Sequence, residues 1–399
     1  MRRWLLTAFA LTLALFAALT AFSLAGDVFA LFGTRLVKHD LGPLEMRLVT
    51  SGDRVVKGLE FYGKSKPFDV VFIGSSRTVF GFDPHSPSLA GLRAYNLGLN
   101  GSHSNEDALL LRYAVEHGPK IGRIVFSVDF EEFFREPGMI PEFESSVFGG
   151  ASPWRGRVMH ALSYEALRKT ATGLAGAQAF YIDTDGFYHY ELQDRRNLLT
   201  GDDFWELPSM AAWFPAYMVQ PYDGYAAQLE TRLNNLVDAL RAARAHGVAV
   251  DFVLPPVHVS RRAMFDLIGY GARYGEWKRA LAKALDKAAA GPGAPLRAFD
   301  FSEVGPVATT VFARGAPLER SPYFFEILHF RPYVGDMMIA RLLDRPWPAP
   351  ETPPFGSPLK ETTTDARIAA DDQAVRAWEK ANPALVDRIR AIIAVADRR

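Results

Sequence analysis

The 399-residue chain contains no cysteine, so disulfide bonds, thiolate catalysis and cysteine-ligated zinc are excluded. Its formal net charge is zero, and no basic segment is interleaved with aromatic residues. Nucleic acid is therefore not an expected partner. The sequence also lacks a phosphate-binding glycine loop and a dinucleotide-binding fingerprint, and we expect no cofactor.

Histidine is scarce as well, and no two of the nine histidines have metal-ligand spacing on one predicted helix. We therefore expect no metal site, although a site built from His103, His258 and His329 is conceivable. The segment Asp183–Gly186 begins like a calcium-binding loop, but the later ligands are missing. A simple turn is the favoured interpretation.

Long apolar runs are absent except at the N-terminus, where Trp4–Ala25 carries no charged residue. About 20 apolar residues cross the hydrocarbon core of a bilayer. Arg2 and Arg3 precede the run, so the positive-inside rule predicts a single-pass inner-membrane protein with its main domain in the periplasm. The small residues of Ser23–Ala25 also fit a cleavage site, so residues 1–26 are either an anchor or a removed signal segment.

After a connector over residues 27–67, strand patterns alternate with helix patterns. Apolar runs predict strands at 70–73, 123–128, 248–254 and 296–301, with a short strand from Tyr95, and periodic patterns predict helices at 105–117, 222–246, 260–290 and 333–343. Strand, helix and strand in this order imply right-handed parallel crossovers. We therefore predict an α/β fold over residues 68–344, a three-layer α/β/α sandwich with a mainly parallel, flavodoxin-like sheet.

Residues 131–221 interrupt this alternation with many aromatic residues, and we expect an insertion with one helix near 157–178. The insertion is a lid or substrate platform, or simply the packed core of a subdomain. Residues 345–364 are rich in proline and predict a linker. Residues 365–399 predict two short helices, the second capped by Asn382, which dock on the body or on a partner.

Candidate chemistry begins where the first strand ends, because Gly-Ser-Ser-Arg at residues 74–77 directly follows the apolar run. Open α/β sheets bind ligands at the carboxyl ends of their strands, and a hydroxyl at this edge stands where a nucleophile would. Gly74 permits a sharp turn that would leave Ser76 at the rim. Ordinary turn chemistry is the alternative for this serine pair.

An acyl-transfer serine needs a base, a group that orients the base, and donors for an oxyanion. His329 is the best candidate base, because it follows the last strand, precedes the last helix and so lies at the same rim. Glu326, three residues upstream, could fold back to one imidazole nitrogen, and Asp300 at its strand end is the fallback acid. A helix-entry loop with a capping histidine is the alternative.

These motifs resemble those of the SGNH (GDSL-like) hydrolase superfamily. The resemblance is greatest to its membrane-anchored cell-envelope branch, which includes teichoic-acid D-alanylation and alginate O-acetyltransferase-like proteins. Gly-Ser-Ser-Arg with a following Gly-x-Asp-Pro resembles the first block of the family, in which Ser76 takes the nucleophile's place and Ser75 that of the usual Asp. The Asn-x-Gly-x-x-Gly motif ending at Gly101 resembles the second block. It implies that the amides of Gly101 and Ser76 bind the oxyanion.

Two blocks depart from the family pattern. The last block is normally Asp-x-x-His, whereas this chain has Glu326-x-x-His329 before Arg-Pro. The third block often supplies an Asn, whereas this chain has Asp129 there, so Asn100 or Asn105 is a candidate replacement donor. The candidate substrate contacts are Ser75, Arg77, Asn100, Asp129 and His258. His258 lies in a Pro-Pro-x-His motif that recurs in this branch, and it could equally cap the next helix.

The resemblance spans residues 68–343 and implies a serine esterase or O-acyltransferase with an acyl-serine intermediate, acetyl being the expected acyl group. Its substrates would be cell-envelope or exported polysaccharides, and such relatives often act beside a membrane-bound acyltransferase. The alternative is a non-catalytic envelope factor that binds glycan or an assembly partner, which Glu326 and the missing Asn favour. A lipid-acting esterase is a third hypothesis.

Overall fold

The computed structural model describes residues 2–27, 31–32, 47–49, 53–134, 139, 141–174, 180–189, 225–310, 323–325 and 327–396. The chain divides into two compact units. The smaller unit joins Met1–Lys64 to Ile140–Arg196, and the larger joins Ser65–Met139 to Asn197–Arg399. The connector of the sequence analysis and a large part of its insertion therefore belong to one unit.

A six-stranded sheet lies in the larger unit, in the order β3-β2-β4-β6-β7-β8. The first five of these strands pair in parallel, and β8 pairs antiparallel with β7. This confirms the predicted α/β class with a mainly parallel sheet. The strands are β2 (Phe68–Ile73), β3 (Ala94–Asn96), β4 (Ile121–Ser127), β6 (Ala249–Leu254), β7 (Leu296–Asp300) and β8 (Ser357–Pro358).

Strand β2 lies between two parallel neighbours and is buried on both faces. Its residues Val70–Ile73 are at most 2 % exposed, which explains why the strand is an uninterrupted apolar run. Ile73 lies opposite Phe126 of β4, and Phe126 lies opposite Phe252 of β6. Because these strands are parallel and in register, the segments that follow them emerge at one edge of the sheet.

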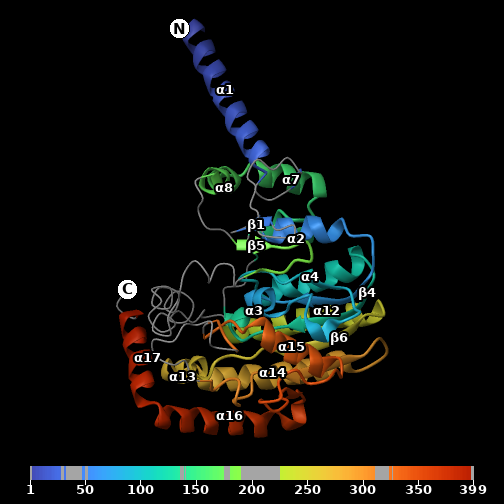
Figure 1. Cartoon of the computed structure of the whole chain (residues 1–399), viewed down its shortest axis with the longest axis vertical. Coiled ribbons are helices and arrows are strands. Elements are labelled where there is room, and N and C mark those ends of the chain that lie inside the picture. The colour runs from blue at the N-terminus through green and yellow to red at the C-terminus, as the bar shows by residue number, and fades with distance from the viewer. Residues whose placement is uncertain are drawn as a thin grey trace. The chain divides into compact units, whose positions relative to one another are not determined.

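The helices of the larger unit pack on one another in two sets. Helix α4 packs on α12, α12 on α14 and α14 on α16, whereas α3 packs on α15 (Figure 1). Their bounds are α3 (Ser76–Gly81), α4 (Ser104–His117), α5 (Glu131–Phe134), α12 (Tyr225–Ala245), α13 (Val259–Leu267), α14 (Gly271–Ala289), α15 (Pro332–Leu342), α16 (Glu361–Ala381) and α17 (Pro383–Ala396), with a 3-10 turn, η1, at Pro87–Leu89.

The helix expected over 260–290 is two helices, α13 and α14, because Gly269 between them has a φ of +78°. The C-terminal helices are present, and α16 packs on α13 and α14, so they dock on the body of this unit. The proline-rich segment before them contributes β8, which the sequence analysis treated as linker.

The smaller unit contains a two-stranded antiparallel sheet of β1 and β5. The helix expected near 157–178 is two helices, α7 and α8, because the side chain of Ser163 accepts a hydrogen bond from the amide of Ala166 and starts a new helix. The elements are α1 (Arg2–Gly26), β1 (Arg47–Val49), α2 (Asp53–Tyr62), α6 (Pro141–Glu144), η2 (Val147–Gly149), α7 (Pro153–Ala161), α8 (Tyr164–Leu174) and β5 (Phe180–Ile182).

Helix α1 is 25 residues long, with a mean hydropathy of 2.2 in its most apolar window and none of that window buried. It is long and apolar enough to span a membrane, as a signal sequence at this position also would be.

The Asp183–Gly186 segment is a turn, as expected, in which the Asp183 carboxylate accepts from the amides of Asp185 at 2.9 Å and Phe187 at 3.0 Å. Within the described ranges, no three His, Asp or Glu side chains are grouped so as to hold a metal ion.

Candidate active site

Ser76 and His329 lie 253 residues apart in the chain and meet just beyond the carboxyl end of β2. The Nε2 atom of His329 lies 2.8 Å from the Oγ atom of Ser76. Both side chains are partly exposed, so a substrate can approach the hydroxyl. An accessible hydroxyl hydrogen-bonded to an imidazole is the minimal arrangement of a nucleophile with its general base.

The turn that presents Ser76 depends on Gly74. Its φ is +149°, and a Cβ atom built there would lie 2.4 Å from the carbonyl oxygen of Ser127 on β4. Ser76 is the first residue of α3, and the amides of Thr78 and Val79 donate to the carbonyl of Ser75. The Ser76 amide is thus in the first turn of a helix, where amides have no acceptor within the helix.

His329 is held by a narrow turn that folds back on itself. The amide of Phe325 donates to the carbonyl of His329 at 2.9 Å, and the amide of Arg331 donates to the carbonyl of Tyr323 at 2.8 Å. The ring of Phe80, one turn after Ser76, meets the imidazole edge-on, with centroids 5.1 Å apart. These contacts orient the ring beside α3.

A close approach of α3 to α15 brings the two segments together. A Cβ atom at Gly335 would lie 1.9 Å from the carbonyl oxygen of Gly81, and one at Gly81 would lie 2.0 Å from the ring of Phe330. Phe330 is fully buried and packs edge-on against Phe82, with centroids 5.6 Å apart. The contact between Ser76 and His329 therefore requires the absence of a side chain at both glycines.

The proposed orienting acid, Glu326, lies outside the described residues. The fallback acid, Asp300, contacts other groups: its carboxylate lies 2.6 Å from the Nζ atom of Lys278 and accepts from the amide and hydroxyl of Ser302. The structure therefore does not bring Asp300 to the imidazole of His329.

The segment Asn96–Gly101 lies against the turn that presents Ser76. The side chain of Asn96 donates to the carbonyls of Thr78 and Phe82, each at 2.8 Å, and accepts from the amide of Gly98 at 3.0 Å. The amide of Leu99 donates to the carbonyl of Gly74 at 2.8 Å. Asn100 and Gly101 follow in this loop, Gly101 with a φ of +61°. Their roles as oxyanion donors remain predictions.

Three of the predicted substrate contacts bind one another. The Ser75 hydroxyl donates to Asp129 at 2.9 Å, and Arg77 forms an ion pair with the same carboxylate. Arg77 also donates to Glu131 through both terminal nitrogens and, through Nε, to the carbonyl of Leu328 at 3.0 Å. Arg77 thereby links the nucleophile helix, the end of β4 and the residue preceding His329.

The charges around Arg77 are balanced. Arg261 of α13 donates to Glu131 at 2.9 Å. Burial alone would raise the pKa of Glu131, but Arg77 and Arg261 outweigh it and hold that pKa below its usual value. Burial would likewise lower the pKa of Arg77, but Asp129 and Glu131 raise it. Glu131 and Arg77 are therefore expected to remain ionised at neutral pH.

Sequence reasoning missed Glu131 and Arg261. A signal for the first existed, because Arg77 follows β2 and the acidic run Asp129–Glu132 follows β4. Ion pairing across the rim follows once β2 and β4 are adjacent. For Arg261, on α13, the sequence offered no such signal.

Two further buried carboxyls lie near Asp129. Burial, above all, raises the pKa of Asp107 to about 8, and also raises the pKa of Glu132. Asp129 and Asp107 add to the shift of Glu132 because like charges repel. Ser102 donates to Asp107 at 3.2 Å. With a pKa of about 8, Asp107 is mostly protonated at neutral pH, which limits the negative charge behind Ser76.

His258 caps α13 instead of facing an open site. Its Nδ1 atom accepts from the Ser260 amide and lies 2.7 Å from the Ser260 hydroxyl, and its Nε2 atom lies 2.9 Å from the carbonyl of Thr310. Burial lowers its pKa to about 4, against the opposing effect of Thr310. These contacts fit the helix-capping alternative for His258. They give no support to a role of His258 in substrate binding.

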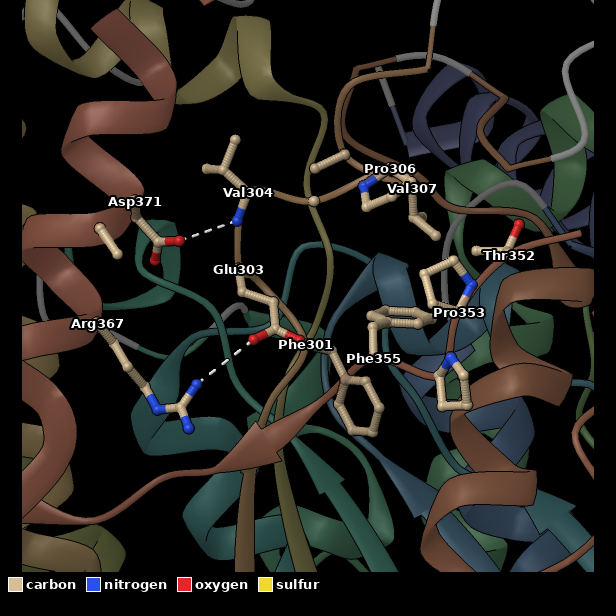
Figure 2. A pocket seen from close by; sticks show the side chains of 14 residues that line it. Phe301, Glu303, Val304, Pro306, Val307, Thr352, Pro353, Phe355, Arg367 and Asp371 are labelled. Atoms are coloured by element: carbon tan, nitrogen blue, oxygen red, sulfur yellow. Dashed lines mark hydrogen bonds and ion pairs between the residues drawn. The ribbon is translucent and has the colours of Figure 1, made fainter. Parts of the chain in front are cut away.

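A cavity of about 340 Å³ lies beside the loop that follows β7. Its described lining includes Phe301, Pro353 and Phe355 on one side and Glu303 and Arg367 on the other, as Figure 2 shows, and includes neither Ser76 nor His329. The cavity is thus distinct from the serine–histidine pair.

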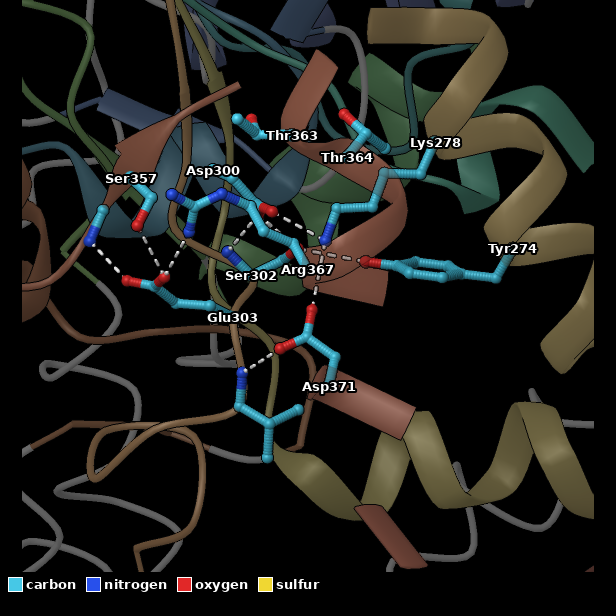
Figure 3. Close-up of polar contacts among 12 residues, drawn as sticks. Tyr274, Lys278, Asp300, Ser302, Glu303, Ser357, Thr363, Thr364, Arg367 and Asp371 are labelled. Atoms are coloured by element: carbon cyan, nitrogen blue, oxygen red, sulfur yellow. Dashed lines mark hydrogen bonds and ion pairs between the residues drawn. The ribbon is translucent and has the colours of Figure 1, made fainter. Parts of the chain in front are cut away.

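Next to this cavity, a buried ionic network links α14, β7 and α16. Lys278 contacts Asp300 at 2.6 Å and Asp371 at 3.2 Å, and Asp371 accepts from the amide of Val304 at 2.9 Å (Figure 3). The hydroxyl of Tyr274 lies 3.0 Å from that of Ser302. These contacts attach the C-terminal helix α16 to the sheet.

No protein-family model matches the chain, and no curated protein matches it.

Proposed function

We propose that this chain is a membrane-anchored serine esterase or O-acyltransferase of the SGNH type that acts outside the cytoplasm through an acyl-Ser76 intermediate. The observation that carries the proposal is the 2.8 Å contact between Ser76 Oγ and His329 Nε2 at the carboxyl edge of a parallel sheet. The parallel order of β3, β2, β4, β6 and β7 supports assignment to a three-layer SGNH-like sandwich.

In the first half-reaction, Ser76 Oγ attacks the carbonyl carbon of the acyl donor while His329 Nε2 accepts the hydroxyl proton. The amides of Ser76 and Gly101 donate to the oxyanion. Collapse of the tetrahedral intermediate breaks the bond to the leaving oxygen, and His329 returns the proton to that oxygen. Glu326 is the proposed orienting acid for the imidazole.

In the second half-reaction, water or a sugar hydroxyl attacks the acyl-serine ester while His329 accepts its proton. The new ester or free acid leaves, and Ser76 recovers its proton from His329. By the resemblance, the acyl group is acetyl and the acceptor is a cell-envelope or exported polysaccharide. A membrane-bound acyltransferase is a fitting donor partner for a periplasmic enzyme held by α1.

Arg77 has a positioning role in this proposal. It is 4 % exposed, and its contacts with Glu131 and the Leu328 carbonyl tie the nucleophile turn to the histidine turn. Ser75 and Asp129 belong to the same support. Substrate would instead meet the exposed side of Ser76 and the Asn100–Gly101 loop.

The rival is a non-catalytic envelope factor of the same fold. One observation favours it: Asp129, at the third-block position, is an acceptor for Ser75 and Arg77 and supplies no donor to an oxyanion. One donor at this position is worth about 3 kcal/mol in serine hydrolases. The factor would bind glycan or an assembly partner without labelling Ser76.

The deciding experiment exposes the full chain, purified in detergent, to a fluorophosphonate probe and then measures acetyl-ester hydrolysis. We expect one label on Ser76, and at least about a 10³-fold loss of turnover in both Ser76→Ala and His329→Ala. Ser75→Ala is the matched control, because this adjacent hydroxyl donates to Asp129; it should keep the label. Folded wild-type protein with neither label nor turnover would favour the rival.

A further inference from the structure

An exposed apolar surface lies on α7 and on the turn that joins it to α8. Outside α1, eight large apolar side chains are exposed in the described residues, and four of them fall within residues 154–164. They are Trp154 at 68 %, Met159 at 60 %, Leu162 at 42 % and Tyr164 at 77 % exposed. We call these four residues the α7–α8 face. Such a concentration marks a surface that contacts something other than water.

The α7–α8 face is attached to the end of α1. The hydroxyl of Ser23, in the last turn of α1, donates to the carbonyl of Ala161 at the end of α7 at 2.5 Å. Thr170 of α8 occupies the place where a Cβ atom of Gly26 would lie, at 2.3 Å. The last turn of α1 is therefore packed against α7 and α8, whereas its most apolar window is bare.

The chain beyond α1 strengthens this attachment. The carboxylate of Asp27 accepts from the amides of Leu31 at 2.7 Å and Phe32 at 3.1 Å, which turns the chain back after the helix. The ring of Phe32 then meets Trp154 edge-on, with centroids 6.4 Å apart. An apolar path thus runs from the end of α1 to the α7–α8 face.

The length of α1 sets the depth of this face. Its 25 residues extend about 37 Å at about 1.5 Å per residue, whereas the hydrocarbon core is about 30 Å thick. A helix that crosses the core from Arg2 and Arg3 therefore reaches the headgroup layer near Ser23. The elements that pack on Ser23 and Gly26 must lie at the same level.

The composition of α7 and α8 matches the headgroup layer. Tryptophan and tyrosine are enriched there, because their rings are apolar and their polar atoms reach water. Residues 153–174 also contain four basic side chains and one acidic one, and Arg155 and Arg168 are exposed. Exposed arginines beside interfacial aromatic residues favour anionic lipid headgroups.

We propose that the α7–α8 face is a membrane-surface contact that rests in the anionic headgroup layer of the bilayer crossed by α1. The face would give the smaller unit a second attachment and fix its orientation on the membrane. The inference depends on α1 as an anchor and is independent of the chemistry of Ser76, so Ser76→Ala should leave it unchanged.

The absence of cysteine makes the test direct, because one introduced cysteine is the sole thiol in the chain. The full chain is placed in nanodiscs of phosphatidylcholine and phosphatidylglycerol and labelled with an environment-sensitive dye. The probe sites are Met159→Cys and Tyr164→Cys on the face. The references are Phe9→Cys, exposed on α1, and Tyr62→Cys, exposed at the end of α2 in the same unit.

We expect headgroup-nitroxide lipids to quench probes 159 and 164 at least about twofold more strongly than probe 62. Acyl-chain nitroxides should quench probe 9 most, and aqueous iodide should quench probe 62 most. Because the nanodiscs contain no protein besides this chain and the scaffold belt, a face that binds a specific protein partner would leave probes 159 and 164 in water. Iodide quenching of both probes equal to that of probe 62 would overturn the proposal.

Lipid charge provides a second arm. Arg155→Gln with Arg168→Gln should weaken headgroup quenching at probe 159 in discs that contain phosphatidylglycerol, and should leave it unchanged in phosphatidylcholine alone. Equal quenching with and without the arginines in both lipids would overturn the preference for anionic headgroups. Unchanged circular dichroism of each variant shows that the fold is retained.

Discussion

The carboxyl edge of one sheet carries two polar sites with opposite properties. After β2, Ser76 and His329 form a hydrogen-bonded pair that is partly open to solvent. After β7, the side chains of Lys278 and Asp300 are 0 % and 1 % exposed, and α16 covers them through Asp371. The same edge thus holds the proposed reactive pair where the chain leaves it open and a structural ionic network where a later helix covers it.

The two sites also treat charge differently. At β7, burial would lower the pKa of Lys278, but Asp300, Tyr274 and Asp371 raise it, and Lys278 in turn holds the pKa of Asp300 below its usual value. At β2, the ion pairs are those of Arg77 with Asp129 and Glu131, and they lie behind the Ser76–His329 pair. A carboxylate at the end of a strand is therefore not by itself the orienting acid of a catalytic histidine.

The largest expected effect is on stability at the β7 site. Lys278→Ala would leave two buried carboxylates unpaired, which typically costs about 3–5 kcal/mol of unfolding free energy. Arg279→Ala is the matched control, because its ion pair with Asp365 is 50 % and 78 % exposed and is worth about 1 kcal/mol or less. Urea unfolding measures both. If both variants lost a comparable amount of unfolding free energy, the buried network of Lys278 would be no more important for stability than an exposed ion pair.

The next effect joins stability to the reactive pair. Gly335→Ala would place a Cβ atom 1.9 Å from the backbone oxygen of Gly81, which cannot rotate away. We expect α15 to shift, with a loss of about 1–3 kcal/mol and slower labelling of Ser76. Gly291→Ala would not serve as a control, because the φ of +83° at Gly291 is strained for alanine even though space is open there. Gly305→Ala, with open space around it, is the control.

A smaller effect should be confined to function. Arg77→Lys keeps one charge near Asp129 but loses the two-nitrogen contact with Glu131 and the Nε contact with Leu328. We expect the maximal rate constant of probe labelling to fall by about tenfold, with no change in its dependence on probe concentration, because the histidine turn loses its support. The control is Lys278→Met at the β7 site. When it is assayed below its unfolding temperature, its Ser76 should be labelled by the probe at the wild-type rate. A tenfold slower rate there too would mean that the β7 site also serves the reaction.

The smallest effect is a difference in pH dependence. The pKa of Asp107 is raised to about 8 in the folded chain, so the folded state holds a proton that the unfolded state releases above pH 4. Stability should therefore fall between about pH 4 and 8, and Asp107→Asn should flatten this slope. Asp300, whose pKa is lowered, contributes stability above about pH 4 that is lost at lower pH. The unfolding free energy measured at pH 5 and pH 7.5 separates the contribution of Asp107 from that of Asp300. If stability fell more steeply with pH in Asp107→Asn than in the wild type, the raised pKa of Asp107 would be contradicted.

Much of the fold was predictable because it depends on local patterns. The strand Val70–Ile73 is apolar throughout because its side chains are buried on both faces of the sheet, and the period of Tyr225–Ala245 is helical. The break between α13 and α14 at Gly269 was visible as a glycine but was not predicted. The break at Ser163 was missed because a serine within a helical pattern is ambiguous until its side chain caps a new helix.

The candidate site divides in the same way. Ser76 and His329 were chosen because strand ends in a parallel sheet share one edge, and that rule needs no side-chain coordinates. Arg77 and Asp129 were predicted to contact substrate, whereas they form an ion pair, and of the two alternatives for His258 the structure shows the cap on α13. A residue type at the rim does not reveal whether its partner is a ligand or another side chain.

The sequence by itself was enough to predict the α/β class, the mainly parallel sheet and the apolar N-terminal helix. It was also enough to select Ser76 and His329, whose side chains meet at 2.8 Å. Tertiary structure alone decided which rim residues face solvent and which pair with one another. It also joined the connector to part of the aromatic insertion and placed α7 and α8 at the end of α1. The reason is that periodicity and propensity act over a few residues, whereas these pairings join segments from 54 residues apart, as for Ser75 and Asp129, to 251 residues apart, as for Arg77 and Leu328.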